Sequence, residues 1–148
     1  MIYIDTSAFV KRYHDEEGSE KVDDVFREVM DGKRTAYISY WVISETINAI
    51  DKHRNRKEFT EDELKKILGA IFYDVHTAIK RGFLVVTEIN PEILSASWDY
   101  IINEHLSAGD ALHLATALYH GCTDFMASDK RLLKVASKMG LNPINPED

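Results

Sequence analysis

The alternation of short β-type runs with helical patterns is the feature that most constrains how this chain folds. Extended runs are expected at residues 1–4, 35–39, 83–89 and 124–128, with a last short one at 141–145. Helix signals lie between them, including a T-x-x-E capping box at Thr60–Glu63 and an Asn90-Pro91 start. The order predicts an α/β fold in three layers (α/β/α), with a mostly parallel central sheet covered by helices on both faces.

Length and composition point to one domain, residues 1–148. The formal net charge of −7 argues against a protein that holds nucleic acid by general electrostatics. It does not exclude a nuclease, because metal-dependent phosphodiesterases carry clustered carboxylates. The lone Cys122 has no partner for an internal disulfide or a CxxC zinc site. With no membrane span or signal peptide recognisable, a cytoplasmic protein is expected.

Four acids are expected to meet at one edge of the sheet. Asp5 and Asp129 directly follow predicted strands, and ligands of open α/β sheets bind outside the carboxyl ends of strands. Glu45 falls in the first turns of the helix after the second strand, and Asp110 opens its own helix. In helical projection, both Glu45 and Asp110 border the apolar arc. All four carboxylates can therefore face one cleft.

Each acid also has an ordinary structural explanation. Asp5 and Asp129 would serve as N-caps, Asp110 as the N3 partner of a Ser107 cap, and Glu45 as a solvated helix residue. Those explanations do not account for the gathering of four acids, which repel one another unless a cation is present. Carboxylate oxygens alone favour Mg²⁺ or Mn²⁺.

The histidines do not support a zinc enzyme. His105, His113 and His120 lack the HExxH spacing and are expected to be ordinary helix or surface residues. His113, three residues after Asp110, would at most orient a ligand or touch substrate. The basic run Lys52–Lys57 is interpreted as a solvated turn between two helices.

Four blocks, in order, are similar to the PIN-domain family, and within it to the VapC-type ribonuclease toxins of toxin-antitoxin pairs. They are YIDTSAFVKRY, ISETINAI, SAGDALHLATAL and ASDKRLLKVASKMGL, within residues 2–50 and 105–146. The segment Asp51–Gly82 has no matching block. The acidic positions of the family fall on the four acids selected above, Asp5, Glu45, Asp110 and Asp129.

The resemblance implies a Mg²⁺- or Mn²⁺-dependent endoribonuclease that hydrolyses RNA phosphodiester bonds with a metal-activated water. It also implies a homodimer and a cognate antitoxin protein as partner. The hydroxyl positions of the family fall on Thr6, Ser7 and Ser128, expected near metal or phosphate. Lys11 and Arg12 would hold the RNA backbone, or else form a solvated pair.

Other functions remain open at this point. A housekeeping RNA-processing PIN nuclease fits the same residues, as does a non-catalytic PIN-like scaffold that binds RNA or protein. The presence of all four acids argues against the scaffold, because a non-catalytic scaffold has no need to tolerate the repulsion between their charges. An aspartyl-phosphate phosphatase of the DxDxT type is excluded, because position 7 is Ser7 and not Asp.

Overall fold

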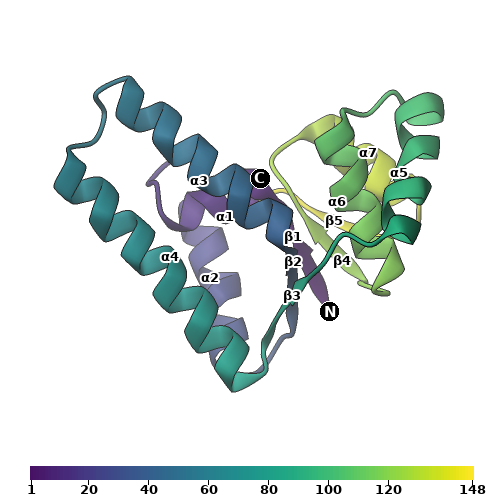
Figure 1. Cartoon of the computed structure of the whole chain (residues 1–148). Coiled ribbons are helices and arrows are strands. Elements are labelled where there is room, and N and C mark those ends of the chain that lie inside the picture. The colour runs from purple at the N-terminus through teal and green to yellow at the C-terminus, as the bar shows by residue number, and fades with distance from the viewer.

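A computed structural model describes residues 1–148 as a five-stranded parallel sheet with helices on both sides (Figure 1). The strand order is β3-β2-β1-β4-β5, and all four strand pairs are parallel. The sheet is therefore wholly parallel, a stricter arrangement than the mostly parallel one expected. The strands are β1 (Ile2–Ile4), β2 (Ala36–Ser39), β3 (Leu84–Thr87), β4 (Asp124–Met126) and β5 (Asn142–Ile144).

Helices connect the strands and form the outer layers. In Figure 1, α2, α3 and α4 lie to one side of the sheet and α5, α6 and α7 to the other, which confirms the three-layer α/β/α architecture. The helical segments are α1 (Thr6–Phe9), the 3-10 turn η1 (Val10–Arg12), α2 (Ser19–Met30), α3 (Tyr40–Asn55), α4 (Glu61–Arg81), α5 (Pro91–Glu104), α6 (Ala108–Tyr119) and α7 (Lys130–Lys138).

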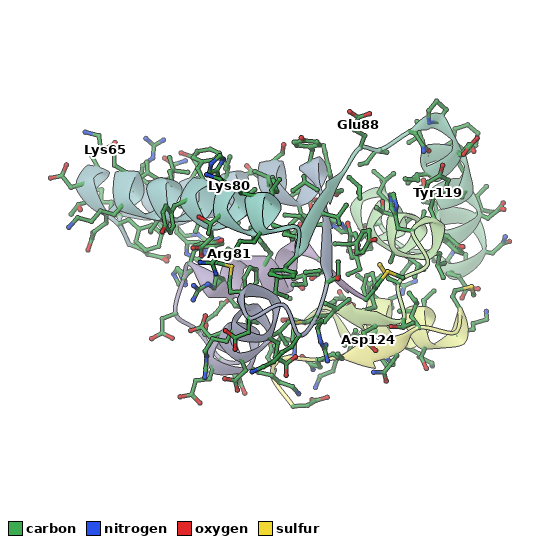
Figure 2. All side chains as sticks on the ribbon, turned by 90° about the horizontal axis from the view of Figure 1, so that it is seen from below. Lys65, Lys80, Arg81, Glu88, Tyr119 and Asp124 are labelled. Atoms are coloured by element: carbon green, nitrogen blue, oxygen red, sulfur yellow. The ribbon has the colours of Figure 1, made fainter.

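The core fills the space between the central strands and the helices. All three residues of β1 are fully buried, as expected for the middle strand of a parallel sheet covered on both faces. α3 and α4 form a long hairpin that extends away from the sheet, and Figure 2 shows Lys65 near its outer end and Lys80 closer to the sheet. No helix combines the length and apolar character needed to cross a membrane.

The local signals in the sequence are confirmed. Thr60 and Glu63 form a full capping box, and the Asn90 side chain accepts a hydrogen bond from the Ile93 amide with Pro91 in the first turn. The basic run is not simply a turn, however. Residues 52–55 form the last turn of α3, because the helix continues to Asn55 before the chain reverses.

Candidate functional site

The strand order places a switch point between β1 and β4. The chain moves from β1 through β2 to β3 on one side and returns to add β4 and β5 on the other. Ligands of such sheets bind at this point, outside the carboxyl ends of the strands. A pocket of about 400 Å³ lies beside it, and its lining includes three of the four predicted acids, Asp5, Glu45 and Asp110.

Asp5 occupies the deepest position of the three acids. It follows β1 and caps α1, where its Oδ1 accepts hydrogen bonds from the Ala8 amide at 3.0 Å and the Ser7 hydroxyl at 2.8 Å. Both bonds use the same oxygen, so Oδ2 remains available to a ligand. The residue is 3% exposed, and this burial raises the pKa of its carboxyl to about 6. In the absence of a cation, the charged form of Asp5 is therefore disfavoured.

Glu45 reaches the pocket from the first half of α3. Its Oε2 accepts a hydrogen bond from the Thr6 hydroxyl and lies 2.8 Å from His113 Nε2. Burial raises the pKa of the half-buried Glu45 carboxyl, but the hydrogen bonds from His113 and Thr6 outweigh it and leave the pKa below its usual value. Glu45 is thus held in its charged form by its neighbours.

His113 connects this carboxylate to the interior, a role that the sequence pattern underestimates. The residue is 2% exposed, so it is not a surface histidine. Its Nδ1 lies 3.0 Å from the Tyr3 hydroxyl, which in turn donates to Ser39 Oγ at 3.3 Å. Hydrogen bonding at one ring nitrogen fixes the orientation of the ring and what the other nitrogen offers. The buried chain from Ser39 through Tyr3 therefore aims His113 Nε2 at Glu45.

Asp110 lies at the start of α6 without acting as its cap. Ser107 is the cap, and its hydroxyl accepts a hydrogen bond from the Asp110 amide at 3.1 Å. The carboxylate of Asp110 is left to line the pocket. Next to it, a Cβ at Gly109 would come within 3.1 Å of Glu45 Oε1, so the absence of a side chain leaves room for that carboxylate.

Asp129 differs from the other three acids because it does not line the pocket. It is exposed and caps α7, accepting hydrogen bonds from the amides of Arg131 and Leu132 at 2.8 and 2.9 Å. The preceding residue joins it to the site, since the Ser128 amide donates to Ser7 Oγ at 2.8 Å. Asp129 therefore lies next to the acidic pocket along the chain, with Ser128 and Ser7 between it and Asp5.

Lys11 and Arg12, proposed from sequence as RNA contacts, are bound to other parts of the protein. Lys11 is 6% exposed, and its ammonium group pairs with Glu147 at 2.9 Å and Glu16 at 3.3 Å. Arg12 pairs with Asp23 at 2.7 Å and Asp74 at 3.3 Å. Neither residue lines the acidic pocket, and we assign neither to the site.

Sequence reasoning missed two polar residues that do line the pocket. Asn48 and Lys52 lie three and seven positions after Glu45 on the continuous helix α3. Positions spaced by three and by seven share one helical face. That spacing is visible in the sequence, but a basic run between two helical patterns is more typical of a solvated turn.

The donor set fits a hard divalent cation. Three carboxylates and the hydroxyls of Thr6 and Ser7 supply oxygen ligands around one pocket. The buried position of Asp5 is consistent with this, because a cation would offset the cost of holding its negative charge there. Asp5, Glu45 and Asp110 are the residues that would hold Mg²⁺ or Mn²⁺.

Comparison with known proteins places the chain in a family. The family model described as "PIN domain" matches residues 2–138. A search of curated proteins finds no match. The structure is similar to VapC20 from Mycobacterium tuberculosis, described as a sarcin-ricin loop cleaving toxin, with a TM-score of 0.65, 15% identity, and coverage of 95% of this chain and 96% of that one.

Two further solved structures have the same fold. VapBC2 from Rickettsia felis, bound to a DNA fragment from its promoter, gives a TM-score of 0.66 at 12% identity and covers 98% of each chain. FitAcB from Neisseria gonorrhoeae gives 0.65 at 16% identity, with coverage of 99% of this chain and 98% of that one. With a family model that matches almost from end to end, and with the sheet and acidic pocket described above, the chain belongs to the PIN domain family.

Proposed function

We propose that this PIN-domain protein is a Mg²⁺- or Mn²⁺-dependent endoribonuclease and the toxin of a toxin-antitoxin pair. The observation that carries the proposal is the convergence of Asp5, Glu45 and Asp110 on one pocket beside the β1/β4 switch point. The similarity in fold to VapC20, described as a sarcin-ricin loop cleaving toxin, and to VapBC2 supports the choice of substrate and biological role.

The side chains of the pocket have separate tasks in this proposal. Asp5, Glu45 and Asp110 bind the cation, and His113 holds Glu45 in position. When bound, the cation supplies Lewis-acid chemistry, which acidifies water and offsets negative charge on the phosphodiester. The hydroxyls of Thr6 and Ser7 donate to Glu45 and Asp5, and in this proposal they orient the two carboxylates that bind the cation. Water is the attacking group in this proposal, because a bound cation would acidify water and the Thr6 and Ser7 hydroxyls are already hydrogen-bonded to carboxylates that would bind the cation.

Incubation of the purified protein with structured and unstructured RNAs tests this activity. Cleavage is expected with Mg²⁺ or Mn²⁺ and is expected to disappear in EDTA and return when metal is added again. The new ends should carry 5′-phosphate and 3′-hydroxyl groups, detected by end-labelling. Equal cleavage in EDTA would overturn the metal-dependent mechanism.

Lys52 is the basic residue that we assign to the RNA backbone. It is exposed and lines the same pocket as the three acids, unlike Lys11 and Arg12. Lys52→Ala is expected to raise KM for RNA with little change in kcat. It should also reduce the slope of log K for RNA binding against log salt concentration by about one, as expected for the loss of one phosphate contact. Arg56→Ala is the matched control, since Arg56 belongs to the same basic run but does not line the pocket. If the two substitutions change KM and the salt dependence equally, Lys52 does not contact RNA at this site.

We further propose that an antitoxin places a basic side chain in the acidic pocket.

We also propose that the protein is a homodimer in the cytoplasm. Helix α5 carries an unpartnered apolar stripe, with Leu94 45%, Trp98 55% and Ile102 68% exposed at intervals of four residues. Light scattering of the free protein should give twice the mass of the chain, and Trp98→Glu should reduce it to the monomer mass. A monomer at micromolar concentration in the wild type would contradict the dimer.

A further inference from the structure

We propose a second metal site, formed by His14, His53 and Glu58, that binds Zn²⁺ or a similar borderline transition metal. It lies where the chain leaves η1 and faces the outer end of the α3–α4 hairpin, and it shares no residue with the acidic pocket. One ligand atom from each of the three residues falls within 4.8 Å of the others. Glu58 Oε2 is 2.5 Å from His53 Nδ1 and 3.9 Å from His14 Nε2.

The His14 ring lacks the hydrogen bonds that a structural role would give it. Its Nδ1 is buried with no partner. Its Nε2 is 3.9 Å from Glu58, beyond hydrogen-bond distance. Nε2 is the ring nitrogen that faces Glu58, and no hydrogen bond holds it, so it is free to coordinate a metal beside a second imidazole and a carboxylate.

The backbone is shaped to bring Glu58 back onto His53. The amide of Glu58 donates to the carbonyl of His53 at 3.1 Å, and the amide of Lys57 donates to the carbonyl of Arg54 at 2.8 Å, which together form a Schellman ending of α3. The left-handed position of this motif usually belongs to Gly, but here it is Lys57, with φ of 63°. A side chain in this conformation is strained, and such strain gathers at functional sites.

The surroundings leave the three side chains oriented but reachable. Phe59 packs against both imidazoles, with ring centroids 5.3 Å from His14 and 5.9 Å from His53. The side chains of His14 and His53 are 21% and 25% exposed, and that of Glu58 is 41% exposed. An ion that enters from the Glu58 side would replace the hydrogen bond between His53 Nδ1 and Glu58 Oε2, and it would keep a water as its fourth ligand.

The ligand types distinguish this site from the acidic pocket. Two imidazole nitrogens and one carboxylate suit Zn²⁺, whereas the oxygen donors around Asp5 suit Mg²⁺ or Mn²⁺. A metal here would join residue 14 to the end of α3 and the start of the following turn. Lys52, which lines the acidic pocket, is adjacent to His53 in the sequence. The metal would thereby restrict the movement of the end of α3, which contributes Lys52 to the lining of the acidic pocket.

Titration of the metal-free protein with ZnCl₂, followed by calorimetry, tests the site. The wild type is expected to bind one Zn²⁺ here in the presence of a large excess of Mg²⁺, since Mg²⁺ avoids imidazole-rich sites. At about 100 times its dissociation constant, Zn²⁺ should raise the melting temperature by roughly 5–10 °C.

Substitutions locate the ion. His53→Asn and Glu58→Gln should each weaken Zn²⁺ binding by more than about 100-fold, beyond the loss caused by removing a group that only supports a ligand. His76→Asn, an exposed histidine on α4, is the matched control and should bind as the wild type does. Circular dichroism checks that each variant is folded. The intensity of visible absorption on Co²⁺ loading reports tetrahedral coordination, and it should also be lost in His14→Asn.

Three results would overturn the proposal. They are the absence of Zn²⁺ binding under excess Mg²⁺, binding that survives in folded His53→Asn and Glu58→Gln, and loss of the bound ion in Asp5→Asn, which would place it in the acidic pocket instead.

Discussion

Asp110→Asn is expected to lower RNA cleavage by more than about 100-fold, beyond the roughly 10–100-fold loss typical of removing a residue that only supports a metal ligand. The substitution keeps the shape of the side chain but removes charge where the cation needs it. Helix α6 should not suffer, because the Ser107 hydroxyl and not the Asp110 carboxylate caps it. The metal-free variant should even melt slightly higher, since one of a set of repelling charges is gone.

Cleavage rates and melting curves with and without Mg²⁺ measure these effects. At about ten times its dissociation constant, Mg²⁺ should stabilise the wild type by about 1.4 kcal/mol, or about 3–6 °C, and Asp110→Asn by less. Asp124→Asn is the control, because Asp124 begins β4 and so lies at the opposite edge of the sheet (Figure 2). If Asp110→Asn cuts RNA normally and shows the full Mg²⁺ shift, Asp110 is not a ligand.

The metal-free protein is expected to lose stability as the pH rises from about 4 to about 7. Burial raises the pKa of Asp5 from 3.8 to about 6, so over this interval the folded state holds a proton that the unfolded state has released. The free energy of unfolding therefore falls with rising pH, by on the order of 3 kcal/mol in total for this group. Four glutamates with lowered pKa values, Glu45, Glu58, Glu63 and Glu147, act in the opposite sense up to about pH 5, so the decline due to Asp5 is expected to be clearest above that pH.

Urea unfolding in EDTA at intervals across this pH range measures the slope, with Asp5→Asn as the comparison. The amide introduced by this substitution cannot titrate, so the variant should lose most of the decline above about pH 5 and exceed the wild type in stability at about pH 7. Saturating Mg²⁺ should flatten the wild-type curve, because the cation binds the charged carboxylate. Parallel curves for wild type and variant in EDTA would contradict the assignment to Asp5.

The capping explanation and the site explanation of the acids are compatible. Asp5 caps α1 with Oδ1 alone, which leaves Oδ2 free for the pocket. At α6 the two tasks are divided between neighbours, since Ser107 caps and Asp110 lines the pocket. Only Asp129 remains a cap outside the pocket, exposed at the start of α7. That Asp is a preferred cap residue is thus no argument against a functional role for an Asp at the carboxyl end of a strand.

The sequence by itself determined the order of strands and helices along the chain, the caps at Thr60 and Asn90, and the edge of the sheet where the acids gather. These features depend on local periodicity, on side chains three or four positions apart, and on the rule that parallel strands share one carboxyl edge. All of them can be recognised without knowing which distant segments meet.

Only the tertiary structure decided which side chains complete the site. His113 is buried because α6 packs against the sheet and brings it to Tyr3, 110 positions earlier in the chain. Lys11 leaves the candidate RNA-binding set because Glu147, near the other end of the chain, pairs with it. Lys52 enters the set because α3 runs on far enough to carry it to the pocket. These outcomes depend on contacts between segments far apart in sequence, which no local pattern specifies.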